Sequence, residues 1–317
     1  MTRPEDRNLA WENYSGLNRA FYGSEPHTYF RHRISNVVLV GGRDAELRQL
    51  LDEGVKFGLL EMSRSEDAPE RNEAEDQESA ERFVALEAEV LLHHTAETLM
   101  RLVLAHRGPP PCPWLELARL RSFVEFKKEL NEVFVDGSSE DRYEMIGVIF
   151  FGGTDRTELE PTPPEDLWDS SFRSIDKFLV RYASGLLSDA HLYNAAKHGL
   201  AVQPGEYGVR LETEIPIARE GMALQYLEVK DGEWHRTVDW VIPELSLVYA
   251  LTATDLMEQL WSVARGRYLG ENDLDLRLFS EEIHKVLRDA ETKSDDRNPF
   301  VPEIDVSEAP LLQRTGV

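Results

Sequence analysis

Residues 83–106, FVALEAEVLLHHTAETLMRLVLAH, decide the fold class of this chain. Apolar residues recur mostly at three- and four-residue steps from Phe83 to Leu104. That spacing places them on one face of an α-helix. Gly108 and the prolines at 109–111 follow, and proline ends a helix because it lacks a backbone N–H and clashes with the preceding turn. The stretch therefore predicts a long amphipathic helix that packs against other helices.

Similar periodicity recurs along most of the chain. It is found in residues 47–60, 114–130, 167–200, 245–263 and 276–287. Residues 206–241 differ, because they alternate in polarity and carry the turn sequence Lys230-Asp231-Gly232-Glu233, whose Asp-Gly pair is typical of a β-hairpin. We therefore expect a mainly α fold, a helical bundle with a small inserted antiparallel hairpin or sheet. The exposed edges of such a sheet suggest that it mediates assembly.

Shifts in composition predict the organisation of the chain. We expect an N-terminal segment at 1–61, an acidic linker at 62–82, a helical core at 83–205, a β-hairpin insertion at 206–241, C-terminal helices at 242–290 and a disordered acidic tail at 291–317. Residues 62–82 are compatible either with a solvated linker or with the polar start of the next helix, and two shorter segments also keep alternatives open. Residues 37–44 read either as the strand and glycine turn that open a nucleotide-binding unit or as a lone strand or helix cap, and residues 145–153 as a buried strand or a helix end.

The composition restricts the cellular compartment and the kinds of partner that we expect for this chain. The net charge is −24, so a nucleic acid would have to meet a local basic patch. Cys112 is the only cysteine, which excludes an intrachain disulfide and a multi-cysteine zinc site and fits a reducing compartment. The N-terminus resembles no secretory signal, and no window approaches the ~18 apolar residues of a membrane span. We expect a cytoplasmic protein that binds no membrane.

Arg101 and His106 form an R-x4-H spacing near the end of the long helix, and a second match joins Arg277 to His284. His94, Glu97 and Arg101 are three and four residues apart and share one helical face. His106 is rotated from Arg101 by about 140° on an ideal helix. The two side chains converge only if the helix loosens at its end or a second copy of the helix packs alongside, which suits a dimeric site.

The R-x4-6-H spacing resembles the motif of the HEPN superfamily, small helical domains that often dimerise and cut RNA without a metal. The resemblance implies a metal-independent endoribonuclease with no cofactor, RNA as partner and a toxin or phage-defence role. It implies that Arg101 steadies the phosphate and that His106 transfers protons while the RNA 2′-OH attacks. A cation offsets charge on the transition state, and an imidazole shuttles protons near neutral pH. Leu102 departs from the family, whose active members often carry a polar residue there.

A second segment, residues 188–200, ends in Asn194, Lys197 and His198 before Gly199. An Asn-x-x-Lys-His-Gly ending is similar to segments of HEPN-type proteins that pack near the arginine-bearing helix. The resemblance implies that these three residues bind substrate together with His94 and Glu97. In the simpler interpretation, Lys197 and His198 only complement the negative end of the helix dipole.

Two functions from different classes follow. One is the endoribonuclease, and the alternative is a non-catalytic helical scaffold or protein-binding module. The sequence leaves open whether the chain is an enzyme. The basic residues around the motif would have to converge in one cleft or across a two-fold interface in a nuclease; they are Arg101, Arg107, Lys127, Lys128, Lys197 and His198. Adjacent histidines such as His93 and His94 point about 100° apart on a helix, so we expect no metal site.

Overall fold

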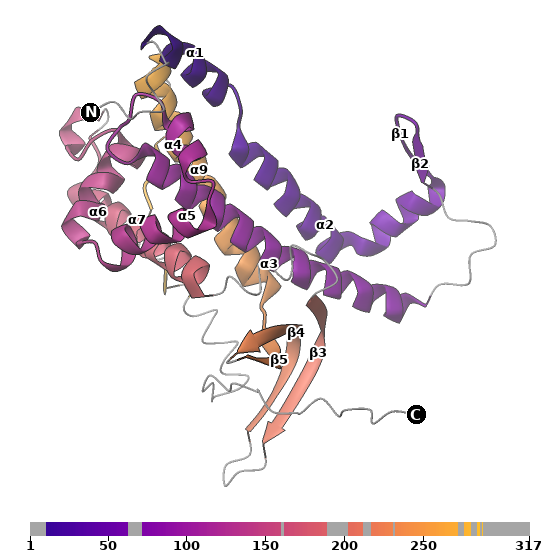
Figure 1. Ribbon diagram of the computed structural model, residues 1–317. Helices are drawn as coiled ribbons and strands as arrows, with labels where there is room; N and C mark the ends of the chain where they lie inside the picture. The colour runs from indigo at the N-terminus through magenta and orange to yellow at the C-terminus, as the bar shows by residue number, and fades with distance from the viewer. Residues whose placement is uncertain are drawn as a thin grey trace. The chain divides into compact units, whose positions relative to one another are not determined.

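The fold is mainly α-helical and carries a small three-stranded antiparallel sheet, as the sequence predicts (Figure 1). The structure, a computed structural model, describes residues 11–62, 72–159, 162–188, 202–211, 217–230, 232–271, 276–279, 284–285 and 287. The chain divides into two compact units. Unit 1 comprises Met1–Ile34, Leu91–Ala190 and Leu247–Ala290, and unit 2 comprises Ser35–Val90, His191–Ser246 and Glu291–Val317.

The described part of the chain consists mainly of helices. They are α1 (Trp11–Tyr22), α2 (Pro26–Glu53), α3 (Glu73–His106), α4 (Pro113–Arg119), α5 (Phe123–Leu130), α6 (Ser139–Ile146), α7 (Glu165–Ser188) and α9 (Pro243–Leu269). Three shorter helical segments are η2 (Asn131–Val135) and η3 (Gly147–Phe151), both π-helical, and η4 (Arg156–Glu158), a 3₁₀ turn. Among the described residues, none of the helices combines the length and apolar character needed to cross a membrane.

Helix α3 confirms the helix predicted over 83–106 and begins ten residues earlier. Its first turn carries Glu73, Glu75 and Asp76, and acidic side chains stabilise the positive end of a helix. Of the two interpretations of residues 62–82, a linker or the polar start of the next helix, the second holds from residue 73 onward. Gly108, with a φ of +71°, follows the last turn in the left-handed region that glycine adopts readily.

Helix α2 corrects the interpretation of residues 37–44. The glycine pair Gly41–Gly42 lies inside the helix, so these residues form no nucleotide-binding turn. Arg43, with a φ of −141° and a ψ of 32°, interrupts the helical backbone at a kink. The helix expected over 47–60 ends at Glu53. It is followed by a short hairpin, β1 (Val55–Phe57) and β2 (Leu60–Met62), that the periodicity did not predict.

The spacing from Trp114 to Leu130 predicts one helix that ends near Asp136-Gly137. The structure ends η2 at Val135, close to that point, but the single helix is wrong. The segment forms α4 and α5, which are separated at residues 120–122. Ser122 has an extended backbone at the start of α5, and the carbonyl of Leu120 accepts a hydrogen bond from the Arg101 side chain. That tertiary hydrogen bond satisfies a carbonyl at the end of α4 that the helix leaves without a partner.

In unit 1 aromatic side chains fill the core. Phe151 and Trp168 both contact the ring of Phe172, with centroids 4.9 and 5.0 Å away. Residues 145–153, left open as a strand or a helix end, are the end of α6 followed by η3. Within unit 1, Tyr182 of α7 donates a hydrogen bond of 2.8 Å to the Tyr249 carbonyl of α9. Helix α7 confirms the predicted helix as far as Ser188.

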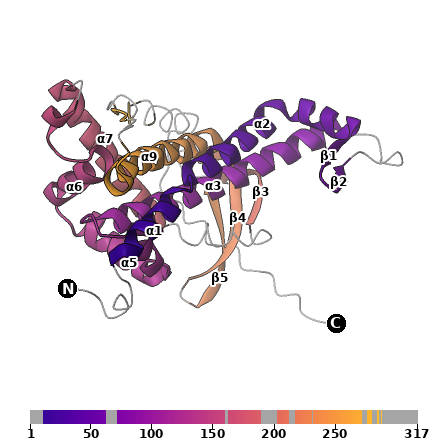
Figure 2. The ribbon, with the colours of Figure 1, turned by 90° about the horizontal axis from the view of Figure 1, so that it is seen from above.

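In unit 2 the sheet has the order β3 (Val202–Leu211), β4 (Ile217–Lys230) and β5 (Glu233–Trp240), all antiparallel, with β4 in the middle (Figures 1 and 2). Lys230 pairs with Glu233 across a two-residue turn, and Gly232 has a φ of +86°. This confirms the predicted hairpin. The inner face of the sheet forms a small core with α3, made by Val202, Leu224, Tyr226, Leu86, Val90 and Val241.

Several sequence predictions fall on residues outside the described part. They concern the helix expected over 189–200, the tail at 291–317 and most of the helix expected over 276–287. Residues 276–279 of that last segment are described and are not helical.

Two glycine substitutions test the packing of η3. A Cβ at Gly147 would lie 2.6 Å from the Thr154 side chain and 2.9 Å from the Gly153 carbonyl oxygen, so Gly147→Ala should destabilise the fold by ~1–3 kcal/mol. Gly42 in α2 is the control, because nothing lies within 4 Å of its added Cβ and alanine favours helix by up to ~1 kcal/mol. Urea unfolding of both variants measures the difference, and equal stabilities would contradict the packing described here.

Candidate functional site

The guanidinium of Arg101 is held by three neighbours within unit 1. Its Nε and Nη2 lie 2.8 and 2.7 Å from Oε1 of Glu97, one turn earlier in α3. Its Nη1 donates to the carbonyl of Leu120, and its Cζ lies 4.1 Å from the ring centre of Phe126. The side chain is 17% exposed. These contacts join α3 to α4 and α5, so Arg101 serves as a structural tie.

His106 lies in the core of unit 1 and is 2% exposed. Its Nδ1 is 2.7 Å from the Leu102 carbonyl oxygen, and its Nε2 is 2.7 Å from the hydroxyl of Tyr22. A carbonyl only accepts, so Nδ1 carries the proton and Nε2 accepts from Tyr22; the tautomer follows from these partners. Both ring nitrogens are therefore occupied by intramolecular hydrogen bonds.

Aromatic rings enclose the His106–Tyr22 pair. Tyr22 contacts Trp261 edge-on at 5.0 Å and stacks on Tyr268 at 5.6 Å between ring centres. Burial in this cluster lowers the pKa of His106 from 6.5 to about 4, although the hydrogen bond to Leu102 opposes the shift. Burial also raises the pKa of Tyr22. At neutral pH the pair is uncharged.

The remaining motif residues do not gather around Arg101 and His106. His94 lies against α2, where its Nδ1 is 3.3 Å from Arg33 Nη1 and its ring is edge-on to Phe30. Glu97 is the ion-pair partner of Arg101. Asn194, Lys197 and His198 lie outside the described residues. Within the described part, the structure brings together only Glu97 and Arg101 of the predicted set.

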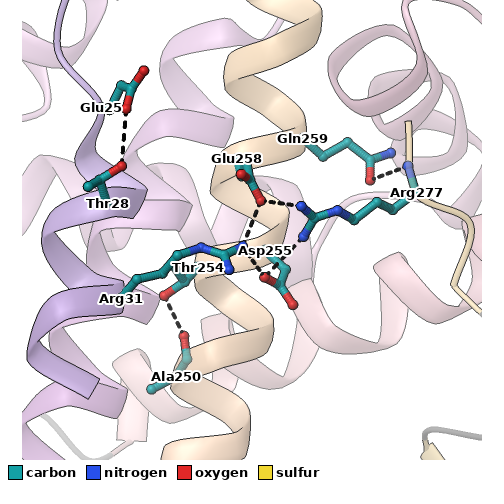
Figure 3. A network of polar contacts seen from close by, with 9 residues as sticks. All are labelled: Glu25, Thr28, Arg31, Ala250, Thr254, Asp255, Glu258, Gln259 and Arg277. Carbon is teal, nitrogen blue, oxygen red and sulfur yellow. Dashed lines mark hydrogen bonds and ion pairs between the residues drawn. The ribbon is translucent and has the colours of Figure 1, made fainter. Parts of the chain in front are cut away.

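The second R-x6-H match is also dispersed. Arg277 forms ion pairs with Asp255 and Glu258 of α9, and Arg31 of α2 binds the same two carboxylates at 2.6 Å each (Figure 3). His284 instead lies against α7, 3.1 Å from the Ser174 carbonyl oxygen. The four-charge network braces α2 and the segment around Arg277 on α9, and no sequence signal indicated it.

A cavity of about 980 Å³ lies in unit 1 near the end of α3. Four cations line it, Arg107, Arg119, Arg121 and Lys128, together with four carboxylates, Glu116, Glu125, Glu129 and Glu132. Three of the cations are paired: Arg119 with Glu116, Arg107 with Glu129 at 3.8 Å, and Lys128 with Glu132 at 3.5 Å. The charges of the lining cancel, so the cavity lacks the positive potential that attracts a phosphate backbone.

The basic residues expected to converge do so only in part. Arg107 and Lys128 line the cavity, but neither Arg101 nor His106 does. Lys127 instead donates to the Leu187 carbonyl at 3.2 Å and lies over the ring of Phe123. Within the described residues, no group of three or more histidine, cysteine and acidic side chains is placed to hold a metal ion.

The sheet of unit 2 has a second apolar face that the sequence analysis did not single out. Leu227 and Val229 of β4 and Trp234 of β5 are 57, 53 and 65% exposed, and Val229 pairs directly with Trp234. We call these three residues the outer sheet face, since the inner face packs on α3. The sequence does contain a sign of this second face, because apolar residues in 224–229 occupy both even positions (Leu224, Tyr226) and odd positions (Leu227, Val229).

The chain was compared with protein-family models, curated proteins and solved structures, and none of them matches it.

The neutral state of His106 predicts a pH dependence of stability. Between pH 6.5 and about 4 the unfolded chain binds a proton at His106 and the folded chain does not. The free energy of unfolding should therefore fall as the pH falls through that window, by up to ~3 kcal/mol. In His106→Gln, which cannot titrate there, this part of the loss should be absent. Urea unfolding at a series of pH values compares the two proteins, and parallel curves would show that His106 is not buried as a neutral group.

Proposed function

We propose that this chain is a non-catalytic helical scaffold that binds a protein partner through the outer sheet face. The observation that carries the proposal is the exposure of three large apolar side chains, Leu227, Val229 and Trp234, on a sheet whose other face is already covered by a helix. Apolar surface left in water costs about 25 cal/mol per Å² relative to burial. Covering this face with another protein surface recovers that free energy.

The composition of this face fits a protein interface. Arg236 stands directly opposite Leu227 in the sheet and therefore shares the outer side with the apolar residues. Tryptophan and arginine are the residue types enriched where interfaces concentrate their binding energy. A tryptophan beside two aliphatic side chains, with an arginine at the rim, is an arrangement suited to a protein partner.

The positions of Arg101 and His106 support the non-catalytic part of the proposal. A phosphate at the Arg101 guanidinium would have to compete with Glu97 and the Leu120 carbonyl, which already contact all three of its nitrogens. His106 would have to leave the aromatic cluster to reach a substrate proton, since both of its nitrogens are bonded within the core. A general base needs its proton acceptor within reach of the substrate.

An RNA-cleavage assay separates the scaffold from the HEPN-type endoribonuclease that the R-x4-H spacing implies. On the scaffold proposal, the purified protein leaves a broad set of single-stranded RNAs intact in the absence of metal. The nuclease hypothesis predicts cleavage that is lost in both Arg101→Ala and His106→Ala. The milder variants Arg101→Lys and His106→Gln control for loss of folding. The scaffold proposal would be overturned if the parent protein cleaves RNA and both milder variants fail to do so.

Binding of the neutral hydrophobic dye Nile red tests the outer sheet face. Because the face is the exposed apolar cluster on the sheet, the triple change Leu227→Ser, Val229→Thr and Trp234→Ser should remove most of the fluorescence enhancement. Val124 on α5 is 79% exposed and lies outside the sheet, so Val124→Ser is the matched control and should leave the signal unchanged. Equal dye binding by the triple variant and the parent would contradict a docking surface at this face.

A further inference from the structure

The free edge of β5 adds a second feature to the outer sheet face. Strand β5 ends the sheet, and among the described residues no strand pairs with its other side. The Val241 N–H donates to the Met222 carbonyl at 3.1 Å, continuing the β4–β5 register in which Trp240 faces Ala223. In an antiparallel pair, hydrogen-bonded and non-hydrogen-bonded positions alternate. The odd-numbered residues of β5 therefore bond to β4.

The even-numbered residues of β5 then direct their backbone groups to the open edge. Trp234, Arg236 and Val238 present N–H and C=O groups there, and their side chains lie on the outer side of the sheet. Natural sheets protect exposed edges with short strands, proline or several charges. This edge is eight residues long and contains no proline, and its charged residues, Glu233, Arg236 and Asp239, are of both signs, so they can be complementary to those of a second strand. Another strand can therefore pair along it.

We infer that the partner at this edge is a second copy of this chain, joined by antiparallel pairing of β5 with β5 about a two-fold axis at Thr237. The inference goes beyond the proposed docking role, because pairing at the edge extends the sheet and leaves the outer sheet face of both copies open to a further partner. Both copies contribute the same edge, so each outward-facing N–H of one meets a carbonyl of the other. Arg236 of each copy faces Val238 of its partner and exchanges both backbone hydrogen bonds with it.

Several two-fold registers would pair the outward-facing N–H and C=O groups of the two β5 strands, and the side-chain charges select one of them. An axis at Arg236 would place the two Arg236 side chains opposite each other and Glu233 opposite Asp239, and like charges in opposed positions are destabilising. An axis at Val238 pairs only residues 236–240. An axis at Thr237 pairs residues 234–240, with His235 facing Asp239 and Trp234 facing Trp240 on both sides of the axis. It gives the longest pairing without opposed like charges.

Cysteine substitutions read the register directly. At the axis the two Thr237 residues form a non-hydrogen-bonded pair, whose Cα atoms lie about 4.5 Å apart, within disulfide range. Thr237→Cys should therefore give a disulfide-linked dimer on mild oxidation. Arg236→Cys and Val238→Cys are matched controls that should not cross-link, because each faces a different residue and is ~7 Å along the strand from its own counterpart. The native Cys112 is buried and does not compete.

A proline substitution tests the same edge without a cross-link. Arg236→Pro removes one outward-facing N–H and leaves the bonds to β4 intact, so the fold should persist while the dimer is lost. Arg236→Ala keeps the N–H and should remain dimeric. Sedimentation velocity over a range of concentrations measures the mass, which should halve in Arg236→Pro, and circular dichroism checks the fold.

The outcomes separate the two proposals. A monomeric parent protein with no Thr237→Cys cross-link overturns self-pairing. If Nile red still depends on Leu227, Val229 and Trp234 in that case, the docking face stands without the edge pairing. Cross-linking strongest at position 236 or 238, or a dimer that survives Arg236→Pro, also overturns the proposed edge pairing.

Discussion

The guanidinium of Arg101 is the contact on which the local arrangement of α3, α4 and α5 depends. Arginine is planar and always charged, so it can bond a carboxylate, a carbonyl and a ring face at once, which lysine cannot. Here Glu97, the Leu120 carbonyl and Phe126 take those three directions. Removing the side chain would leave a partly buried carboxylate and a carbonyl without their donor.

The R-x4-H spacing satisfies two separate structural needs on two sides of one helix. His106 is rotated about 140° from Arg101, so it points to Tyr22 while Arg101 points to Leu120. Helical geometry predicts this divergence from the sequence. It does not predict the partners, because Tyr22 is 84 residues away and Leu120 is 19 residues away in the chain. The sequence therefore identified individual residues of structural importance, but not a site, because the contacts that separate Arg101 from His106 are encoded by no local pattern.

The same division between local and tertiary signals explains which parts of the fold the sequence predicted. Helices α3 and α9 and the β4–β5 turn follow from apolar periodicity, helix-ending residues and the Asp-Gly pair, all local features. The valines at the middle of α2 favoured a strand, but among the described residues no strand pairs with them. Arg31 instead ties α2 to the carboxylates of Asp255 and Glu258, which are 224 and 227 residues away in the chain. The break between α4 and α5 likewise depends on a distant arginine.

The sheet shows how a turn can fix a register that side-chain polarity leaves open. Residues 224–229 are apolar at odd and even positions, so a one-residue slip would still bury a hydrophobic face. The two-residue turn at Gly232 selects the register in which Leu224 and Tyr226 face α3, and Leu227 and Val229 are left outside. A net charge of −24 keeps copies apart at long range, but at physiological salt that repulsion is screened beyond about 8 Å. At contact distance the local charges decide, and β5 carries Arg236 and His235 among its acids. An acidic chain can therefore remain dispersed and still pair at this one edge.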